Sequence, residues 1–543
     1  MTQQEDRKFN RIQKGKSCVG YAEFKDNCWN FSIISTHEHS DVLTNEYLAG
    51  FIQGELQGED MIRASRNNTW KSSYLCDTSH TFPHTCPPEP KDLKKAENSL
   101  KSNYLFTTKW IRDNREEPAI GKYVKAIERL FYRMWGIYDA LSCGYIRSID
   151  EVKNDLFNWD TFSLGYGEDK ISFGDIYFIN TQMDLMDAVA NSLESTYGLH
   201  KPDHCSAFVK RTDDGDIVWT HNSWCGYLSN SHTISYTIRN NEGGIDFVSQ
   251  NSYCFGQVGS NMDFGFNKHG ICFNETTHRY SYNPMSQSQK EEAVWLCWRS
   301  AAAEMFATDI DDFFNYIKTS NSGTYLNGYM VIDANTKEMS LIEMSYKRFA
   351  MLRCGKDSCL TGKYEPENEF DPDLDYDKHL MTNEYILGVN YPVFKKVAYD
   401  LGSTDNRPLR RVQFFDMIGN VNNEEDAKAL ITHIADDEPL SIYGRWDLGF
   451  GTTEYPRTIP DGAVDSKAFS ANKVLELLSG LKYEPSDEGT KTLFWMLYGV
   501  AWFKGKPFVW SQSPWKEYKD DPAKDFVPDE LTGKWHQTKL FLK

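Results

Sequence analysis

The sequence lacks the features that mark several large classes of protein. Its longest apolar run, Leu493–Phe503, has about half the length that a membrane-spanning helix needs. There is no excess of basic charge, because 59 Lys and Arg stand against 78 Asp and Glu, and a net charge of −19 repels phosphate backbones. The 543-residue chain is therefore expected to have no membrane-spanning helix and to bind no nucleic acid.

The common catalytic motifs are also missing. There is no G-x-S-x-G turn, no Walker A loop, no G-x-G-x-x-G and no H-E-x-x-H, which excludes the usual serine hydrolases, nucleotide enzymes and zinc proteases. No C-x-x-C pair occurs, so a zinc ribbon and a thioredoxin motif are excluded as well. Any catalytic chemistry must therefore come from residues that only the fold brings together.

Signals for the compartment disagree with one another. The first ten residues contain no apolar stretch of the kind found in signal peptides. Twelve cysteines and glycosylation sequons at Asn30, Asn67 and Asn274 instead favour a secreted glycoprotein with disulfides. Cys76 and Cys86 flank a proline-containing loop, where they either form a disulfide or stay reduced.

Apolar residues and turn signals predict a mixed fold. The 77 aromatic residues, 15 Trp, 30 Tyr and 32 Phe, supply ample surface for a large core. Helical spacing is found at 47–56, 120–141, 182–197 and 290–306, so the first 200 residues are expected to be mostly helical. Strands are expected at 205–211, 216–222, 233–239, 244–248, 270–274, 328–333 and 340–344. Helices on both sides of a strand-rich middle indicate a layered α+β architecture.

One cysteine stands out because of its place in a predicted hairpin. Asp214-Gly215 is typical of a tight hairpin turn between strands 205–211 and 216–222. Such a turn places Cys205 opposite residues 223–225, with His221 and Trp224 as its neighbours across the hairpin. A thiol beside an imidazole can form a reactive thiolate near neutral pH, although a purely structural cysteine and histidine fit the same pattern.

Ten short segments in collinear order carry a resemblance to a known family. They are VGYAEF at 19–24, NEYLAGFIQGEL at 45–56, HCSAFV at 204–209, THNSW at 220–224, ETTH at 275–278, SGTYLNGYMVID at 322–333, DEPLS at 437–441, RWDL at 445–448, GAVDSK at 462–467 and KPFVWS at 506–511. On these segments the chain resembles the phospholipase B-like family, whose members are N-terminal nucleophile hydrolases.

The resemblance implies a fold and a maturation step. The fold is a four-layer αββα sandwich, with two antiparallel sheets between outer helices. Autocatalytic cleavage between His204 and Cys205 would leave a largely helical fragment, 1–204, and a catalytic fragment, 205–543, held together as one folded unit. The α-amine set free on Cys205 could then accept the proton of the thiol in the same residue.

The resemblance also assigns roles by matched position. Cys205 would be the nucleophile, and the other roles would fall to His221 and Trp224 as orienting groups, Thr276 and Thr277 as hydroxyl or backbone donors, Asn327 as the oxyanion-hole amide, and Arg445 as the fixed cation that favours the thiolate. A structural hydrogen bond of His221 and a structural pairing of Arg445 with Asp447 are the alternatives. No cofactor and no metal are expected.

Three functions remain open from the sequence. The first is a hydrolase that removes acyl groups from glycerophospholipids through a Cys205 thioester, with peripheral contact to a membrane. The second is an amidase for small or lipid-derived amides, since the same nucleophile attacks either bond. The third is a non-catalytic lipid-binding protein on the same fold. The family resemblance implies a lysosomal or secreted location.

Overall fold

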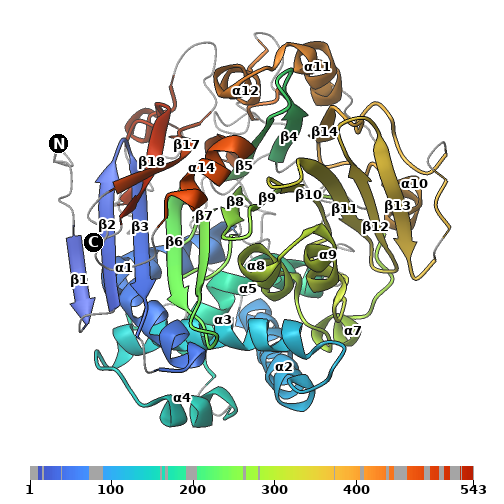
Figure 1. The fold of residues 1–543 in the computed structure, drawn as a ribbon. Helices are drawn as coiled ribbons and strands as arrows, with labels where there is room; N and C mark the ends of the chain where they lie inside the picture. Colours follow the sequence, from blue (N-terminus) through green and yellow to red (C-terminus); the bar gives the residue numbers. More distant parts are fainter. Residues whose placement is uncertain are drawn as a thin grey trace.

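Two β-sheets form the centre of the molecule, as seen in the computed structural model (Figure 1). The structure describes residues 10–14, 18–37, 40–72, 90–158, 162–165, 169–190, 205–260, 264–278, 282–367, 369–371, 374–403, 409–435, 440–444, 461–481, 490–500, 507–513, 526–527 and 529–541. Within these residues both helices and large sheets are present, and the expected α+β class is confirmed.

The larger sheet has 11 strands. In spatial order they are β1 (Asn10–Lys14), β2 (Cys18–Lys25), β3 (Cys28–Ser35), β6 (His232–Arg239), β7 (Ile245–Ser252), β8 (Phe264–Asn267), β9 (Ile271–Thr277), β10 (Asn327–Asp333), β11 (Glu338–Met344), β12 (Phe349–Cys354) and β13 (Cys359–Glu365). Neighbouring strands are antiparallel except β3 and β6, which pair in parallel. Since β3 precedes Cys205 and β6 follows it, residues from both sides of the expected cleavage point share one sheet. The division at Cys205 itself remains a prediction.

The smaller sheet has seven strands. Its order is β14 (Tyr385–Gly388), β4 (Cys205–Arg211), β5 (Ile217–Gly226), β16 (Asp465–Ser470), β17 (Thr490–Tyr498) and β18 (His536–Phe541), with β15 (Asp461–Ala463) paired to β5. Strand β9 of the larger sheet packs against β4 and β5 of the smaller one. The two sheets therefore meet at the strand that begins with Cys205.

Helices cover the outer side of each sheet. They are α1 (Val42–Ser72), α2 (Pro90–Asn114), α3 (Gly121–Ser142), α4 (Ile149–Leu156), α5 (Phe173–Ala190), α7 (Gln287–Glu291), α8 (Leu296–Phe306), α9 (Ile310–Lys318), α10 (Lys395–Leu401), α11 (Leu409–Met417), α12 (Glu424–Ile431) and α14 (Ala471–Ser479). Of these, α1, α8 and α9 pack on the larger sheet, and α12 and α14 pack on the smaller sheet (Figure 1). None of the helices in the described ranges combines the length and the apolar character that crossing a membrane requires.

Helices α1 and α3 cross closely because each has a glycine that faces the backbone of the other helix. A Cβ atom on Gly136 would lie 2.0 Å from the Tyr47 carbonyl oxygen, and one on Gly50 would lie 1.9 Å from the Arg133 carbonyl oxygen. Such distances leave no room for a side chain. The buried face of α3 includes Val124 and Leu130, as its helical spacing predicted.

Several sequence expectations were wrong in detail. The described part of the first 200 residues is mostly helical, as expected, but it also contains strands β1–β3, and the helix expected at 182–197 already begins at Phe173. The helix expected at 290–306 is broken into α7 and α8, because the Asp184 carboxylate accepts the backbone N–H groups of Leu296 (2.9 Å) and Cys297 (3.0 Å) and so caps α8 from another helix. A cap supplied from a distant element leaves no local sequence signal.

A disulfide is present among the described residues. Cys354 and Cys359 join β12 to β13, while Cys76 and Cys86 lie outside the described residues. Two of the three sequons are also buried: Asn30 is 2% exposed, and Asn274 is fully buried and donates to the Thr220 carbonyl oxygen at 2.7 Å. A glycan is compatible with the folded chain only at Asn67 among these three.

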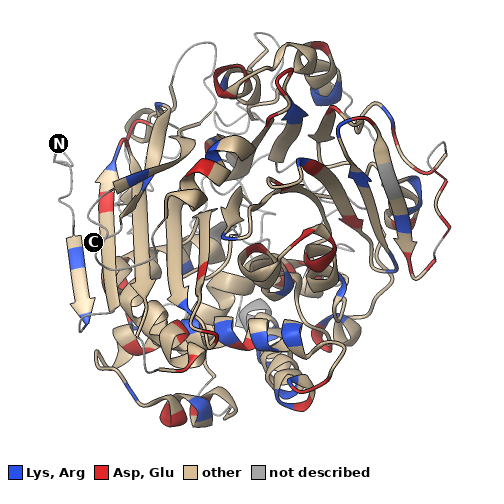
Figure 2. Cartoon of the chain, viewed as in Figure 1, with Lys and Arg blue, Asp and Glu red and all other residues tan. Residues whose placement is uncertain are grey.

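Charged residues lie mainly on helices and loops, and the central strands are largely free of them (Figure 2). One titratable residue that does lie on a central strand is His232, which is fully buried at the start of β6. Its ring stacks on Phe255 and meets Phe31 edge-on, and Nδ1 lies 2.8 Å from the Asn230 carbonyl oxygen. Burial lowers the pKa of His232 from 6.5 to about 4.

This buried imidazole is expected to make the fold sensitive to acid. Between pH 6.5 and 4 the unfolded chain binds a proton at His232 that the folded chain does not, so stability falls as pH falls. The free energy of unfolding therefore includes about 3 kcal/mol that is fully present above pH 6.5 and is lost progressively as pH falls to 4. Urea unfolding across this pH range should give a shallower pH dependence for His232→Phe. His379→Phe, at an exposed position, is the control, and an unchanged slope in His232→Phe would contradict the assignment.

Candidate active site at the head of strand β4

Cys205 is the first residue of β4, and the hairpin with β5 has nearly the expected register. Cys205 pairs with Ser223 and Ala207 pairs with His221. The turn is closed by the Thr212 N–H donating to the Asp216 carbonyl oxygen at 2.9 Å, and Gly215 adopts φ +86°. The partner of Cys205 thus lies within the expected range 223–225, with His221 on the neighbouring strand, and Cys205 is 7% exposed.

Three side chains that bear reactive atoms converge between the two sheets. The Cys205 sulfur, one ring nitrogen of His221 and one carboxylate oxygen of Glu275 all lie within 4.8 Å of one another. Glu275 comes from β9, the strand of the larger sheet that packs on β4 and β5. Glu275 lies in the matched segment ETTH, but no role was predicted for it, because a contact between two sheets leaves no signal along the chain.

Asn390 holds the backbone of Cys205 on one side. It follows β14 and adopts a left-handed conformation with φ +62°, which asparagine tolerates better than most residues. Its Oδ1 accepts the Cys205 N–H at 3.3 Å, and its Nδ2 donates to the Thr277 carbonyl oxygen at 2.7 Å. Because Nδ2 is engaged with Thr277, Oδ1 is fixed toward the Cys205 nitrogen.

Arg410 holds Cys205 on the other side. This buried residue of α11 donates to the Cys205 carbonyl oxygen, to Ser206 Oγ at 3.1 Å and to Asn390 Oδ1 at 2.9 Å. Its guanidinium carbon lies 4.8 Å from the ring centre of Trp224, so the predicted site residue Trp224 stacks on this cation. Sequence reasoning missed both Asn390 and Arg410.

The remaining predicted residues lie at different places. Thr276 packs against Gly388, where an added Cβ would come within 3.0 Å of Thr276 Oγ1, and Thr277 bonds Asn390 as described above. Asn327 pairs with Thr277 across β9 and β10, and its side-chain amide nitrogen is placed to donate to the Leu326 and Tyr325 carbonyl oxygens at 3.0 and 3.1 Å. Its oxyanion role stays a prediction. His204 and Arg445 lie outside the described residues, so their roles also stay predictions.

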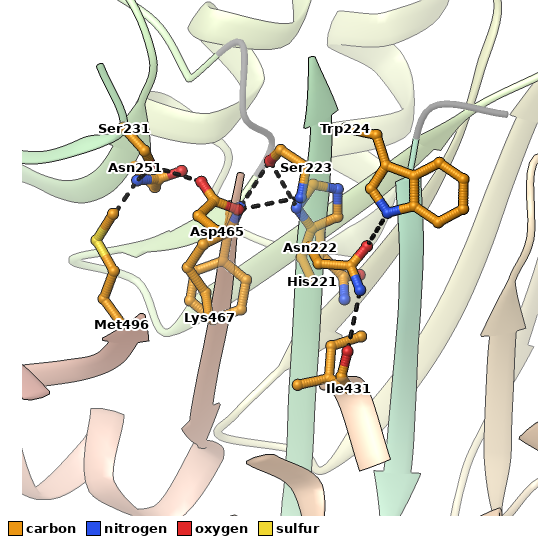
Figure 3. A network of polar contacts seen from close by, with 12 residues as sticks. His221, Asn222, Ser223, Trp224, Ser231, Asn251, Ile431, Asp465, Lys467 and Met496 are labelled. Atoms are coloured by element: carbon orange, nitrogen blue, oxygen red, sulfur yellow. Dashed lines mark hydrogen bonds and ion pairs between the residues drawn. The ribbon is translucent and has the colours of Figure 1, made fainter. Parts of the chain in front are cut away.

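A buried ion pair lies beside His221 on β16, the strand that pairs with β5 on the side away from β4 (Figure 3). Lys467 on β16 is the register partner of His221, and its Nζ donates to Asp465 Oδ1 and to Ser223 Oγ, each at 2.7 Å. Asp465 also accepts the Ser223 N–H at 3.0 Å and the Ser231 hydroxyl. Both charged side chains are fully buried. The network therefore fixes Ser223, the residue directly opposite Cys205.

The surroundings of His221 keep its ring neutral. Burial lowers the pKa of His221 well below 6.5, and the nearby Lys467 charge lowers it further. Nδ1 lies 3.4 Å from Ser223 Oγ. Nε2 has no hydrogen-bond partner of normal geometry among the described residues, although the Glu275 backbone is close enough to act on the pKa. A neutral imidazole offers one nitrogen lone pair to the site.

A buried glutamate anchors the segment that carries Asn390. The carboxylate of Glu343 on β11 accepts the backbone N–H groups of Val393 at 2.7 Å and Phe394 at 3.0 Å. Burial raises the pKa of Glu343 to about 8, and His278 Nε2 lies 3.8 Å from its Oε1. The backbone after β14 is therefore tied to the larger sheet at both Thr277 and Glu343.

Comparison with known proteins agrees with the resemblance found in the sequence. The family model of phospholipase B matches residues 20–416. Phospholipase B-like protein G of Dictyostelium discoideum is 26% identical over 343 residues, covering 57% of this chain and 52% of that protein. Phospholipase B-like 1 of Rattus norvegicus is 23% identical over 320 residues (56% and 51%), and phospholipase B of Crotalus adamanteus is 23% identical over 353 residues (61% and 57%).

The matched regions thus span about half the length of these curated relatives. The family model, in contrast, covers more than half of this chain and includes Cys205, His221, Glu275, Asn390 and Arg410. The chain belongs to the phospholipase B family.

Proposed function

We propose that the protein is a cysteine hydrolase that matures by cleavage before Cys205 and removes acyl groups from glycerophospholipids. The observation that carries the proposal is how Cys205 is held. Its nitrogen faces Asn390 Oδ1 at 3.3 Å, Arg410 binds its carbonyl oxygen, and its sulfur lies within 4.8 Å of His221 and Glu275. Membership in the phospholipase B family supports a lipid acyl group as the substrate.

The order of layers supports the same proposal. Helices cover the outer side of both sheets, and the sheets meet at β4, β5 and β9. We take this arrangement as the αββα sandwich of the N-terminal nucleophile hydrolases, in which the nucleophile is the first residue of a strand. The disulfide Cys354–Cys359 is typical of an oxidising compartment and supports a lysosomal or secreted location.

The proposed reaction uses one residue as both nucleophile and base. The free α-amine of Cys205 takes the thiol proton, and the thiolate attacks the acyl carbonyl to give a tetrahedral oxyanion. Collapse breaks the C–O bond, the ammonium returns its proton to the leaving alkoxide, and an acyl-thioester remains. Water, deprotonated by the amine, then attacks the thioester and releases the fatty acid and the free thiol.

The described contacts fit these steps. Asn390 Oδ1 accepts one N–H of the amine, which directs the nitrogen lone pair of the same residue toward its thiol. The guanidinium of Arg410 places a fixed positive charge beside Cys205, which favours the thiolate over the thiol. The oxyanion donor of this proposal is Asn327, a role that rests on the family resemblance, and one such donor is worth about 3–4 kcal/mol of transition-state stabilisation.

Intact mass and N-terminal sequencing after incubation at mildly acidic pH test the maturation. We expect a new N-terminus at Cys205 in the wild type and none in Cys205→Ala, with Cys143→Ala, at an exposed cysteine, cleaved like the wild type. A chain that stays at 62.7 kDa under all conditions would contradict the maturation step.

The substrate class is tested by mass spectrometry of the cleaved enzyme. Phosphatidylcholine is expected to add one acyl group to Cys205 and to release lysophospholipid and fatty acid. Acylation by matched N-acyl amides, but not by the ester, would replace the proposal with an amidase. Acylation by neither would favour a non-catalytic lipid-binding protein.

A further inference from the structure

We propose that Cys205, His221 and Glu275 form a binding site for a thiophilic divalent cation of the zinc class, and that the bound ion blocks the nucleophile. The binding rests on the three side chains alone. Its inhibitory effect rests on the proposed function. The ion is an inhibitor in this scheme and takes no part in the reaction.

The kind of ligand atoms selects the kind of ion. A sulfur, an imidazole nitrogen and a carboxylate oxygen are the three ligand types that Zn²⁺ uses in proteins, whereas Mg²⁺ and Ca²⁺ need sets of oxygen ligands. All three side chains are buried, each comes from a different strand, and they lie on β4, β5 and β9. Ligands held on strands of two packed sheets are positioned more rigidly than ligands on loops.

The distances are close to those that a zinc ion requires. Tetrahedral bonds of about 2.0–2.3 Å place ligand atoms roughly 3.3–3.8 Å apart. The three atoms here lie within 4.8 Å of one another, so closing these separations by at most about 1 Å gives the spacing of a zinc site. His221 also has a ring nitrogen, Nε2, without a hydrogen-bond partner of normal geometry among the described residues.

Three charged groups decide how tightly the ion is held. A thiolate and the Glu275 carboxylate together balance a divalent cation, which favours binding in a buried site. The ammonium of Lys467, the register partner of His221, opposes it. We therefore expect reversible binding that a chelator removes, rather than a permanent structural site. Cleavage before Cys205 would add its amine as a fourth ligand, next to its own sulfur.

Cobalt substitution tests the site without any assay of catalysis. We expect the purified full-length chain to bind one Co²⁺ with the absorption band of a cobalt–thiolate bond, and Zn²⁺ to displace it. Cys205→Ser should lose the band, and Glu275→Gln should weaken binding more than about tenfold. Cys143→Ser removes an exposed thiol and should keep the band. Thermal unfolding without metal shows that each variant is folded.

The outcomes separate this inference from the proposed function. A missing band in the wild type, or an equal band in Cys205→Ser, would overturn the metal site even if the enzyme hydrolyses lipid. A band that depends on Cys205 and Glu275 supports the site even if no lipid is hydrolysed. Where hydrolysis is present, Zn²⁺ should stop acylation of Cys205 and EDTA should restore it, and acylation that continues with the site filled would overturn the blocking role.

Discussion

Asn390→Gly is expected to lower kcat/KM for phospholipid hydrolysis by about 100- to 1,000-fold, and also to lower the unfolding midpoint, because the Thr277 carbonyl oxygen and the Arg410 guanidinium each lose a buried partner. The variant removes the amide that orients the Cys205 nitrogen and leaves the backbone free to keep its φ of +62°, which glycine adopts without strain. The loss reflects a poorly oriented amine, so kcat should fall more than KM changes. Fatty-acid release and cleavage before Cys205 are measured on the same samples.

Asn27→Gly is the matched control for this prediction. Asn27 has φ +65° in the turn between β2 and β3, so the same substitution is made in the same backbone conformation away from Cys205. Asn390→Asp is a second test, because it keeps an acceptor for the Cys205 nitrogen but turns an oxygen toward the Thr277 carbonyl oxygen. Full activity in Asn390→Gly, or an equal loss in Asn27→Gly, would show that Asn390 is not a positioning residue.

The part of the site that the sequence could predict is the part set by local geometry. The Asp214-Gly215 turn fixes the register of its two strands, and that register brings Ser223 opposite Cys205 and His221 beside it. The periodic helix of α3 was predictable for the same reason, since its buried positions recur within one element.

The rest of the site depends on contacts between distant elements. Glu275 reaches Cys205 because two sheets pack face to face, and Asn390 and Arg410 reach it from a loop and a helix about 200 residues away along the chain. The spacing of residue types along the sequence gives no signal for such contacts. The family resemblance assigned a fixed cation beside the nucleophile, and Arg410 is a buried cation that the described residues place at Cys205. The expected one, Arg445, lies outside them.

Lys467→Met is expected to lower the free energy of unfolding by about 3–5 kcal/mol. The substitution leaves the fully buried Asp465 carboxylate with hydrogen bonds from Ser223 and Ser231 but without its cation. An uncompensated buried charge costs far more than the lost contact itself. Urea unfolding at neutral pH measures the change, and Lys94→Met, which breaks the more exposed Lys94–Glu97 pair, should cost under about 1 kcal/mol.

A double variant shows whether the cost arises from the unpaired charge. Asp465→Asn in the Lys467→Met background removes the carboxylate charge, so the double variant should be more stable than the sum of the two single losses predicts. Removing the cation beside His221 should also raise the pKa of its ring, which NMR titration of His221 measures. Strictly additive losses together with an unchanged His221 titration would mean that Lys467 acts through packing alone. The Lys467–Asp465 charges would then have no influence on the strand that faces Cys205.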